Sequence, residues 1–315
     1  MEMMSAVRPL ETFVPPRAAG QRDVLSLALP PMPLLHVAFV GVGVRGRMAV
    51  TRWCHIPKVE IAAVCDVSKE VAEEVARHVE QLGKPRPKVY WGETAYKELC
   101  QQQGVNLVYV CTDWMSHVPI AIHAMEQGRS VAVEVPAALT LKDIWTLIDT
   151  AEQTRQHCMM LENAVYDRFE MAVCQMVREG LLGELVHVEG GYAHPIGDRW
   201  TPWRMEYSRL NAGDVYPTHS IGPVCRLLDI HRTDRMHYLT AMQTNAFLGT
   251  EMYQAVKGKA CDSFANGDQT STMIRTVKGK TMLIQHNVMT PRPYSRMFQA
   301  VGTAGYAAKY PVPEV

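Results

Sequence analysis

The sequence predicts an α/β protein in two parts, a doubly wound parallel sheet followed by an α+β domain with an open, mainly antiparallel sheet. Short apolar strands alternate with helices of about 10–15 residues through the first half, which is the pattern of βαβ units. After residue 163 the strand-like runs become longer and fewer helices separate them. The chain of 315 residues is also long enough for two domains of roughly 100–200 residues each.

The elements of the first half follow one another in alternation. Leu34–Val42 is a β-branched apolar run that ends in glycines, so it predicts a buried strand. Further strands are expected at Val59–Cys65, Asn106–Cys111, Ser130–Val135 and Cys158–Leu161. Helices are expected over Arg45–His55, from the Ser68 cap to about Gln81, near His117–Gln127, and over Lys142–Arg155 after a Thr140 cap.

The pattern changes near residue 162, where we place the domain boundary. A helix over Tyr166–Glu179 ends at glycines, and Lys278-Gly279-Lys280 suits a hairpin turn. Strands are expected at Leu185–Ala193, His237–Phe247, Thr270–Val277 and Thr281–Val288. We therefore expect domains of residues 34–162 and 163–315, after an N-terminal arm or disordered leader of residues 1–33 that is rich in Pro and Ala.

Composition argues against several classes of function. Lys plus Arg and Asp plus Glu both number 32, so the formal net charge is zero and we expect neither nucleic acid nor an anionic membrane as main partner. No apolar run approaches the roughly 20 residues that span a bilayer. The leader lacks the basic start and apolar core of a secretory signal, so a cytoplasmic location is expected. The eight Cys and twelve His show no zinc spacing, so we expect buried reduced thiols and no metal.

A glycine-rich turn follows the first predicted strand and opens a helix. In the run Gly41-Val42-Gly43-Val44-Arg45-Gly46, the first glycine permits a tight turn, the second lets the backbone approach a pyrophosphate, and the third allows close packing. Asp66 ends the second strand about twenty residues later, where a carboxylate binds ribose hydroxyls and repels a 2′-phosphate. The sequence therefore predicts a Rossmann domain that binds NAD; the alternative is a nucleotide-free turn.

Polar residues also follow the other predicted strands, at the sheet edge where ligands bind. The segments are Thr112–His117, Glu134-Val135-Pro136 and Glu162-Asn163. We expect each to contact the cofactor, with Trp114 as a wall; the alternative for Trp114 is a side chain that fills the core.

These residues resemble known families. The N-terminal half is similar to the Gfo/Idh/MocA oxidoreductase superfamily, which pairs a Rossmann domain with an open-sheet substrate domain and usually has Glu-Lys-Pro where this chain has Glu134-Val135-Pro136. From about His36 onward the chain resembles glycoside hydrolase family 109, the NAD-dependent α-N-acetylgalactosaminidases. Family members usually run on beyond the point matching Val315, and many carry an export signal. The segments that carry the resemblance are LENAVYDRFEM, GELVHVEGGYAH, GDVYPTHSIGP, NGDQTSTM and QHNVMTPRPYSRM.

The resemblance implies two sets of site residues. The cofactor set is Arg45, Gly46, Asp66, Trp114, Met115, Ser116, His117, Glu134, Val135 and Asn163, besides Gly41 and Gly43 of the loop. The substrate set is Tyr192, Arg204, Tyr216, Pro217, Thr218, His219 and Tyr294. The implied substrate is a glycan with terminal N-acetylgalactosamine, and analogy implies a homodimer formed through the C-terminal sheet.

The implied reaction is a hydrolysis without net redox change. Hydride passes from C3 of the sugar to NAD, the C2 proton is removed, the glycosidic oxygen leaves, water adds and the hydride returns. We expect His219 to take the C3 hydroxyl proton and Tyr192 to transfer a proton at C2 or the leaving group. Tyr216 is expected to share a helix face with His219, and His194 a strand face with Tyr192. No convincing carboxylate pair is evident near these residues.

Other interpretations remain open at this point. In one of them His219 and Tyr192 are satisfied structural side chains, and Asp214 caps the helix of Tyr216. We interpret His231, His237 and His286 as structural. The alternative functions are an NAD-dependent sugar dehydrogenase and a non-catalytic NAD-binding relative. The absence of Lys at position 135 argues against the dehydrogenase, and the retained tyrosines and histidine argue against loss of activity.

Overall fold

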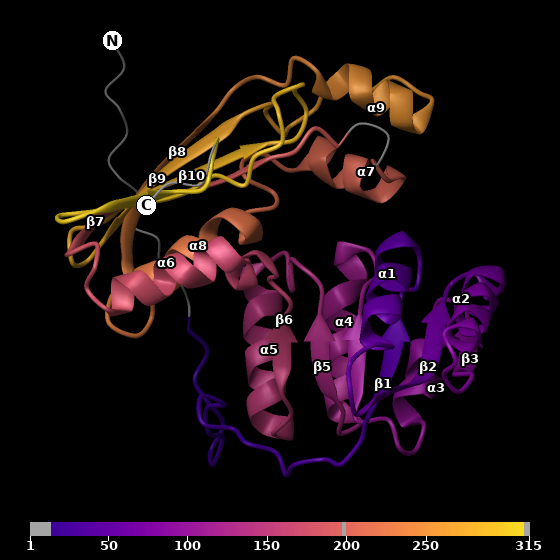
Figure 1. Cartoon of the computed structure of the whole chain (residues 1–315). Helices are drawn as coiled ribbons and strands as arrows, with labels where there is room; N and C mark the ends of the chain where they lie inside the picture. Colours follow the sequence, from indigo (N-terminus) through magenta and orange to yellow (C-terminus); the bar gives the residue numbers. More distant parts are fainter. Residues whose placement is uncertain (1–13, 197–199, 312–315) are drawn as a thin grey trace. The chain divides into compact units, whose positions relative to one another are not determined.

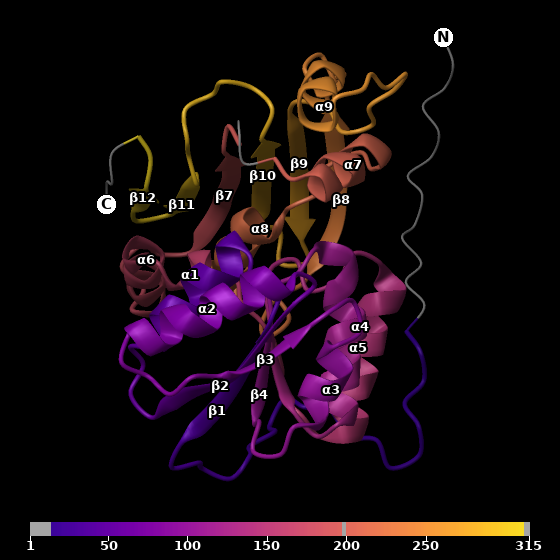
Figure 2. The same ribbon diagram turned by 90° about the vertical axis from the view of Figure 1, so that its right-hand side faces the viewer.

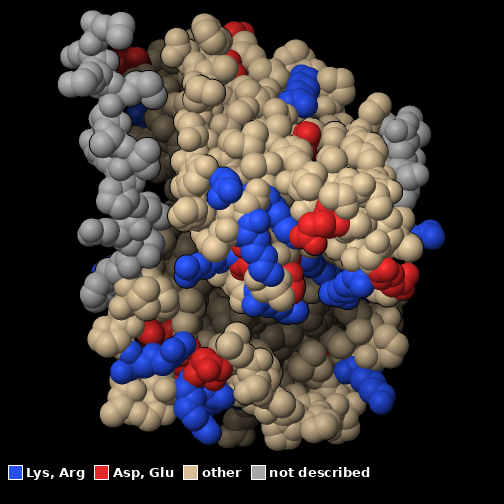
Figure 3. Space-filling model, turned by 90° about the vertical axis from the view of Figure 1, so that its left-hand side faces the viewer, with Lys and Arg blue, Asp and Glu red and all other residues tan. Residues whose placement is uncertain are grey.

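The computed structural model describes residues 14–196 and 200–311. Two compact units divide the chain between Leu161 and Glu162, and Figures 1 and 2 show the elements of each. Basic and acidic side chains lie among one another on the face shown in Figure 3, in keeping with the formal net charge of zero. Among the described helices, none is both long and apolar enough to cross a membrane.

The first unit is built on a parallel sheet of the order β3-β2-β1-β4-β5-β6. The order reverses between β1 and β4, which is the switch point of a doubly wound fold. The strands are β1 (Leu35–Val40), β2 (Val59–Asp66), β3 (Lys88–Trp91), β4 (Leu107–Val110), β5 (Ser130–Val133) and β6 (Cys158–Met160). The helices are α1 (Val44–Trp53), α2 (Lys69–Gln81), α3 (Tyr96–Gln101), α4 (Trp114–Glu126) and α5 (Leu141–Thr154).

Alternate side chains of the central strands serve two cores, one on each face of this sheet. Val37 and Phe39 of β1 pack with Val50 of α1 and Val75 of α2. On the other face, Ala38 and Val40 belong to the cluster that includes apolar residues of α3, α4 and α5. Because both faces are covered, the strands are apolar along their whole length, which is why the sequence showed them as short continuous runs.

The predicted elements of the first unit are present, with shifted ends. Asp113 caps α4 through the backbone N–H of Ser116, so this helix begins three residues before the expected start at His117. The caps at Ser68 and Thr140 are found as predicted. The short elements β3 and α3 were not predicted, since four and six residues give little periodicity. Part of the expected leader is ordered against α5, where Arg17 pairs with Glu152 at 2.7 Å.

The second unit contains a sheet of the order β12-β11-β7-β10-β9-β8. Its strand pairs are antiparallel except β7 with β10, which run parallel. The strands are β7 (Leu185–Ala193), β8 (Met236–Gln243), β9 (Thr270–Thr276), β10 (Thr281–Asn287), β11 (Phe298–Gly302) and β12 (Tyr306–Ala308). The helices are η1, a 3₁₀ turn (Ala164–Tyr166), α6 (Arg168–Arg178), α7 (Pro202–Leu210), α8 (Thr218–Leu227) and α9 (Gly249–Lys257).

Helices α6 and α8 cover one face of this second sheet (Figure 1). Val188 of β7 and Ile284 of β10 pack there against Val224 of α8. The hairpin at Gly279 is found as predicted, with the glycine at φ 87°. The prediction for β8 was too long by several residues, and α7, α9, β11 and β12 were not predicted.

The fold class predicted from the sequence is thus confirmed, as an α/β chain with a parallel sheet followed by a mixed, mostly antiparallel one. The eight cysteines all lie in the described part of the chain, and all are free thiols. Burial raises the pKa of the Cys65 thiol to about 12, so this side chain stays protonated and unreactive at neutral pH.

Candidate functional site

The glycine loop has the geometry of a phosphate cradle. Gly41 has φ +83°, and a Cβ there would lie 2.5 Å from the backbone oxygen of Cys111. A Cβ on Gly46 would lie 2.0 Å from the oxygen of Gly41, so this position keeps helix α1 close to the loop. Gly43, by contrast, is exposed and would meet nothing within 4 Å. The fold itself therefore needs the first and third glycines, while the second borders open space at the N-terminus of α1, where backbone N–H groups attract anions.

Asp66 lies at the end of β2 beside this loop. Its Oδ2 accepts a hydrogen bond from the backbone N–H of Val42 at 2.9 Å, and its Oδ1 accepts one from Ser68 at 3.1 Å. Each oxygen keeps a further lone pair for a ribose hydroxyl. Trp91 is paired with Asp66 across β2 and β3, and it is 49% exposed with Lys69 over its ring. This aromatic was not among the predicted site residues, because the four residues of β3 show little periodicity.

Arg45 and Glu134 form an ion pair at the carboxyl edge of the same sheet. Arg45 Nε lies 3.0 Å and Nη2 3.3 Å from the two carboxylate oxygens of Glu134, and the hydroxyl of Tyr109 donates to the same carboxylate at 2.7 Å. Burial of the hydroxyl, together with the neighbouring Glu134 carboxylate, raises the pKa of Tyr109, so its hydroxyl stays a donor. Val135 beside this pair is buried and brings no titratable group.

The segment after β4 forms the first turn of α4. Trp114 and His117 are buried, whereas Met115 is exposed. His117 Nδ1 lies 2.8 Å from the backbone oxygen of Pro136 and Nε2 lies 3.3 Å from that of Thr112. Burial lowers the pKa of His117, so the ring is neutral at pH 7 and ties the loop after β4 to the loop after β5. Ser116 Oγ donates to Asp113, which makes this side chain part of the helix cap.

An aromatic and imidazole cluster forms in the second unit. The ring of Tyr192 lies 5.3 Å from that of His219 and 5.4 Å from that of Tyr216, and the rings of Tyr216 and His219 meet edge to face at 5.0 Å. The Tyr192 hydroxyl and His194 Nδ1 are 2.8 Å apart in a hydrogen bond, and the ring of Tyr294 meets His194 at 5.1 Å. The structure thus brings together the expected His219, Tyr192, His194, Tyr216 and Tyr294.

One detail of this cluster corrects the sequence analysis. Helix α8 begins at Thr218 with Pro217 as its N-cap, so Tyr216 precedes the helix and does not share a helix face with His219. Asp214 Oδ1 accepts a hydrogen bond from the Tyr216 backbone N–H at 3.0 Å, which closes a turn ahead of the helix. Asp214 therefore does not cap α8. The Tyr216 ring reaches His219 because this turn folds the chain back ahead of the helix, and not through helical spacing.

The remaining expected residues occupy other positions. Arg204 lies on α7 with its guanidinium 5.2 Å from the centre of the Trp203 ring. Thr218 is buried in the first turn of α8. Asn163, expected to contact the cofactor, is exposed and precedes η1 in the second unit. No group of three or more potential metal ligands occurs within residues 14–196 and 200–311.

Two buried carboxylates flank the cluster, and the sequence analysis gave neither this role. Glu162 Oε1 lies 2.8 Å from His219 Nδ1, with both side chains buried. Asp214 Oδ1 lies 4.0 Å from Nδ1 of His286, whose ring stacks on Tyr192. Burial raises the pKa of Asp214 to about 6 and lowers that of His286 to about 4. The contact of Glu162 with His219 could not be predicted from local spacing, because the two residues are 57 positions apart.

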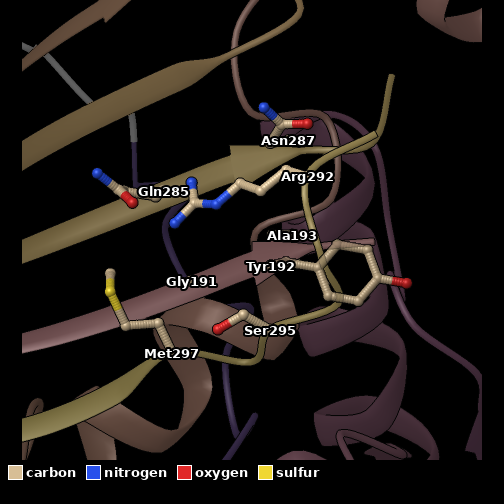
Figure 4. A pocket seen from close by; sticks show the side chains of 8 residues that line it. All are labelled: Gly191, Tyr192, Ala193, Gln285, Asn287, Arg292, Ser295 and Met297. Carbon is tan, nitrogen blue, oxygen red and sulfur yellow. The ribbon is translucent and has the colours of Figure 1, made fainter. Parts of the chain in front are cut away.

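A small polar hollow lies on the opposite face of β7 and β10 (Figure 4). Tyr192 is paired with His286, so the neighbouring pair of Gly191 with Gln285 points to the other side of the sheet. Figure 4 shows Arg292 extended toward Gln285. The hollow is shallow and open to solvent, and it is lined by Gly191, Tyr192, Ala193, Gln285, Asn287, Arg292, Ser295 and Met297.

Comparison with known proteins assigns this geometry to a class. A family model described as "Oxidoreductase family, NAD-binding Rossmann fold" matches residues 35–162. The open cradle and the adjacent carboxylate lie in that segment, so this part of the chain is an NAD-binding Rossmann domain. A second model, described as "Glycosyl hydrolase 109, C-terminal domain", matches residues 197–312.

Curated relatives give the particular family. "Glycosyl hydrolase family 109 protein 1" of Bacteroides fragilis (strain YCH46) is 50% identical over 313 residues, which cover 98% of this chain and 68% of the relative. The protein of the same name from Bacteroides thetaiotaomicron is 50% identical over 311 residues, or 97% of this chain and 67% of the relative. The chain belongs to glycosyl hydrolase family 109, and both this prediction and that of NAD are confirmed.

Solved structures share the fold at low identity. The myo-inositol dehydrogenase from Lactobacillus casei in complex with NAD(H) and myo-inositol has a TM-score of 0.68 and 18% identity, covering 90% of this chain and 75% of that one. GenD2 from gentamicin A biosynthesis, in complex with NAD, has a TM-score of 0.69 and 19% identity, covering 94% of this chain and 75% of that one. These similarities support the architecture alone.

Proposed function

We propose that the protein removes terminal α-linked N-acetylgalactosamine from a glycan by an NAD-dependent hydrolysis without net redox change. The observation that carries the proposal is the cluster in which His219 contacts Tyr192 and Tyr216, in a chain whose other unit binds NAD. When bound, NAD supplies a two-electron acceptor for oxidation at C3 of the sugar that is restored by the end of each turnover.

The residues of the first unit fit this cofactor. The open space at Gly43 and the N–H groups of the first turn of α1 suit a pyrophosphate. Asp66 offers its carboxylate to the ribose hydroxyls and disfavours a 2′-phosphate, so NAD is preferred to NADP. The Arg45–Glu134 pair supplies a fixed positive group beside the loop.

Proton transfer falls to the histidine and tyrosines of the cluster. His219 has Nδ1 engaged by Glu162, so Nε2 is the atom that takes the proton of the C3 hydroxyl. Tyr192 transfers a proton at C2 or at the leaving oxygen, and its hydrogen bond to His194 provides a second proton carrier. Arg204 and Tyr294 hold the sugar by hydrogen bonds and ring contact.

The carboxylates near the cluster do not suit ordinary glycoside hydrolysis, in which two carboxyl groups flank the scissile bond. Glu162 Oε1 accepts from His219 and from the backbone N–H of Ala164. Asp214 Oδ1 accepts from Tyr216. In this proposal the two carboxylates hold neighbouring groups, and the acid and base roles go to His219 and Tyr192.

The test is to incubate the purified protein with p-nitrophenyl α-N-acetylgalactosaminide and follow nitrophenol and NADH absorbance together. We expect nitrophenol release without accumulation of NADH. Accumulation of NADH from the free sugar, with no nitrophenol, would instead identify a dehydrogenase. Silence in both channels while NAD binds would contradict the proposed substrate.

A further inference from the structure

We infer that Glu162 is the positioning residue of His219, fixing its imidazole so that Nε2 is the proton-accepting atom. The inference rests on the proposed function, because it gives His219 the proton of the sugar hydroxyl. Glu162 follows β6 in sequence, and the analysis of the sequence expected it at the cofactor. The structure places its carboxylate against the imidazole of His219 in α8.

The contact between Glu162 and His219 is short and buried, and the Glu162 carboxylate is also held by the backbone. Glu162 Oε1 lies 2.8 Å from His219 Nδ1, and the side chains are 7% and 6% exposed. The same oxygen accepts the backbone N–H of Ala164 at 2.7 Å, which holds the carboxylate at the start of η1. Oε2 is buried and has no hydrogen-bond partner among the described residues. The carboxylate thus bonds to the imidazole and to the backbone, and it is shielded from solvent.

A glycine on α8 permits this approach. Gly222 lies three residues after His219, on the same side of the helix. A Cβ at Gly222 would lie 3.0 Å from Glu162 Cγ and 3.4 Å from Cγ1 of Val165. The absence of a side chain there lets α8 pack directly on η1 and on the stem of Glu162.

The chemistry follows from the other groups that face the ring. Tyr192 of β7 and Tyr216 before α8 contact the imidazole through their rings, and His286 of β10 lies beyond Tyr192. Glu162 alone brings an anion into hydrogen-bond contact with His219 among the described contacts. A carboxylate at Nδ1 keeps a proton on that atom, leaves Nε2 basic, and stabilises the imidazolium that forms when Nε2 accepts a proton.

The first experiment reads the tautomer and needs no substrate. We would record long-range ¹H–¹⁵N correlation spectra of ¹⁵N-histidine protein and assign His219 by the signal lost in His219→Asn. We expect the Nδ1–H tautomer in the wild type and in Glu162→Gln, whose amide oxygen still accepts the bond. In Glu162→Ala we expect a shift toward the Nε2–H tautomer that free imidazole prefers. An Nε2–H tautomer in the wild type would overturn the inference.

The second experiment measures kinetics on p-nitrophenyl α-N-acetylgalactosaminide. We expect Glu162→Ala to lower kcat on the order of 100-fold and Glu162→Gln about 10-fold, with KM and NAD affinity nearly unchanged. When His219 is already replaced by Ala, the two Glu162 substitutions should lower kcat no further, because Glu162 acts through His219. Equal losses with and without His219 would show that Glu162 acts elsewhere, and the inference would fail.

The matched control is Glu170→Gln. Glu170 is equally buried and pairs with Lys309 at 2.7 Å, on the same unit but away from the cluster. We expect it to lower Tm while kcat stays unchanged, which separates lost stability from lost positioning. If the wild type releases no nitrophenol but His219 holds the Nδ1–H tautomer, the proposed function fails and the positioning role stands. If turnover occurs and neither tautomer nor kcat responds to Glu162, the positioning role fails alone.

Discussion

At the scale of single residues, Asp66 shows how one side chain serves both the fold and the ligand. Its two oxygens accept N–H groups on either side of it, from Val42 in the glycine loop and from Ser68 at the start of α2. The carboxylate therefore holds the loop in shape before any ribose is bound. A substitution at this position removes a ligand contact and loosens the cradle together.

We predict that Asp66→Ala weakens NAD binding by about 10–100-fold, the equivalent of one or two charge-assisted hydrogen bonds. NADP should lose less affinity, because the repulsion of the 2′-phosphate also disappears. Isothermal titration with both nucleotides measures the two changes. Glu73→Ala, which removes a half-buried carboxylate of α2 that pairs with Arg86, is the control. An unaltered NAD affinity in Asp66→Ala would contradict the assignment.

Asp214 makes stability depend on pH. Burial raises its pKa from 3.8 to about 6, so the folded state holds the proton more tightly than the unfolded state. Its ionisation thus costs stability as pH rises from about 4 to 6. The shift of about two pKa units corresponds to about 3 kcal/mol. His286 has the opposite effect, because burial lowers its pKa from 6.5 to about 4. Its contribution to stability is therefore lost as the pH falls from about 6.5 to 4.

We predict that Asp214→Asn is more stable than the wild type at pH 7, and that the difference shrinks toward pH 4. The asparagine keeps an oxygen for the backbone N–H of Tyr216 but has no charge to desolvate. Urea unfolding at a series of pH values measures the difference in unfolding free energy. Asp262→Asn, at an exposed position, is the control. A difference that stays constant across this window would refute the explanation.

At the scale of elements, close approach at glycines sets the position of α8. A Cβ on Gly190 of β7 would lie 2.3 Å from the backbone oxygen of Ser220, the residue after His219. We predict that Gly190→Ala displaces α8, lowers the free energy of unfolding by about 1–3 kcal/mol and reduces kcat. NAD affinity should stay unchanged, because the cradle belongs to the other unit. Thermal melting, titration and turnover measure the three effects, and a fully active variant would count against this packing.

The glycine loop offers a sharper separation of fold from ligand. Gly43→Ala adds a Cβ that meets no protein atom within 4 Å, so we predict an unchanged Tm and a clear loss of NAD affinity. Gly46→Ala places its Cβ 2.0 Å from the Gly41 oxygen, so Tm should fall as well. Melting curves and titrations on both variants test the contrast. Equal NAD affinity in Gly43→Ala and the wild type would mean that no phosphate lies there.

At the scale of the whole molecule, contacts between residues that are close together in the chain could be predicted from the sequence, whereas contacts between distant residues could not. The cradle and Asp66 lie within one βαβ unit, so local patterns sufficed to find them. Tyr192 and His194 were expected on one strand face, but β7 ends at Ala193 and His194 follows it; the two side chains still meet in a hydrogen bond. The contact of Glu162 with His219 joins residues 57 positions apart and leaves no local pattern.

The ends of helices and the presence of short strands were also difficult to predict from the sequence. Pro217 is the N-cap of α8, so a helix could not be extended back to Tyr216 by spacing alone. The strands β11 and β12 have five and three residues, too few to show alternation. The pairing of β8 and β9 ends earlier than the apolar run suggested, because Gln243 and Thr244 turn toward the loop that holds Gly267.

The parallel pairing of β7 with β10 has a consequence for synthesis on the ribosome. The first sheet is complete once β6 has emerged, whereas His187 of β7 waits for Thr281, 94 residues later. At roughly 5–20 residues per second, β7 spends on the order of 5–20 seconds with both edges unpaired. Its other neighbour, β11, emerges later still. The nucleotide-binding unit can therefore fold first, while the unpaired edges of β7 are open to pairing with neighbouring chains until β10 and β11 emerge.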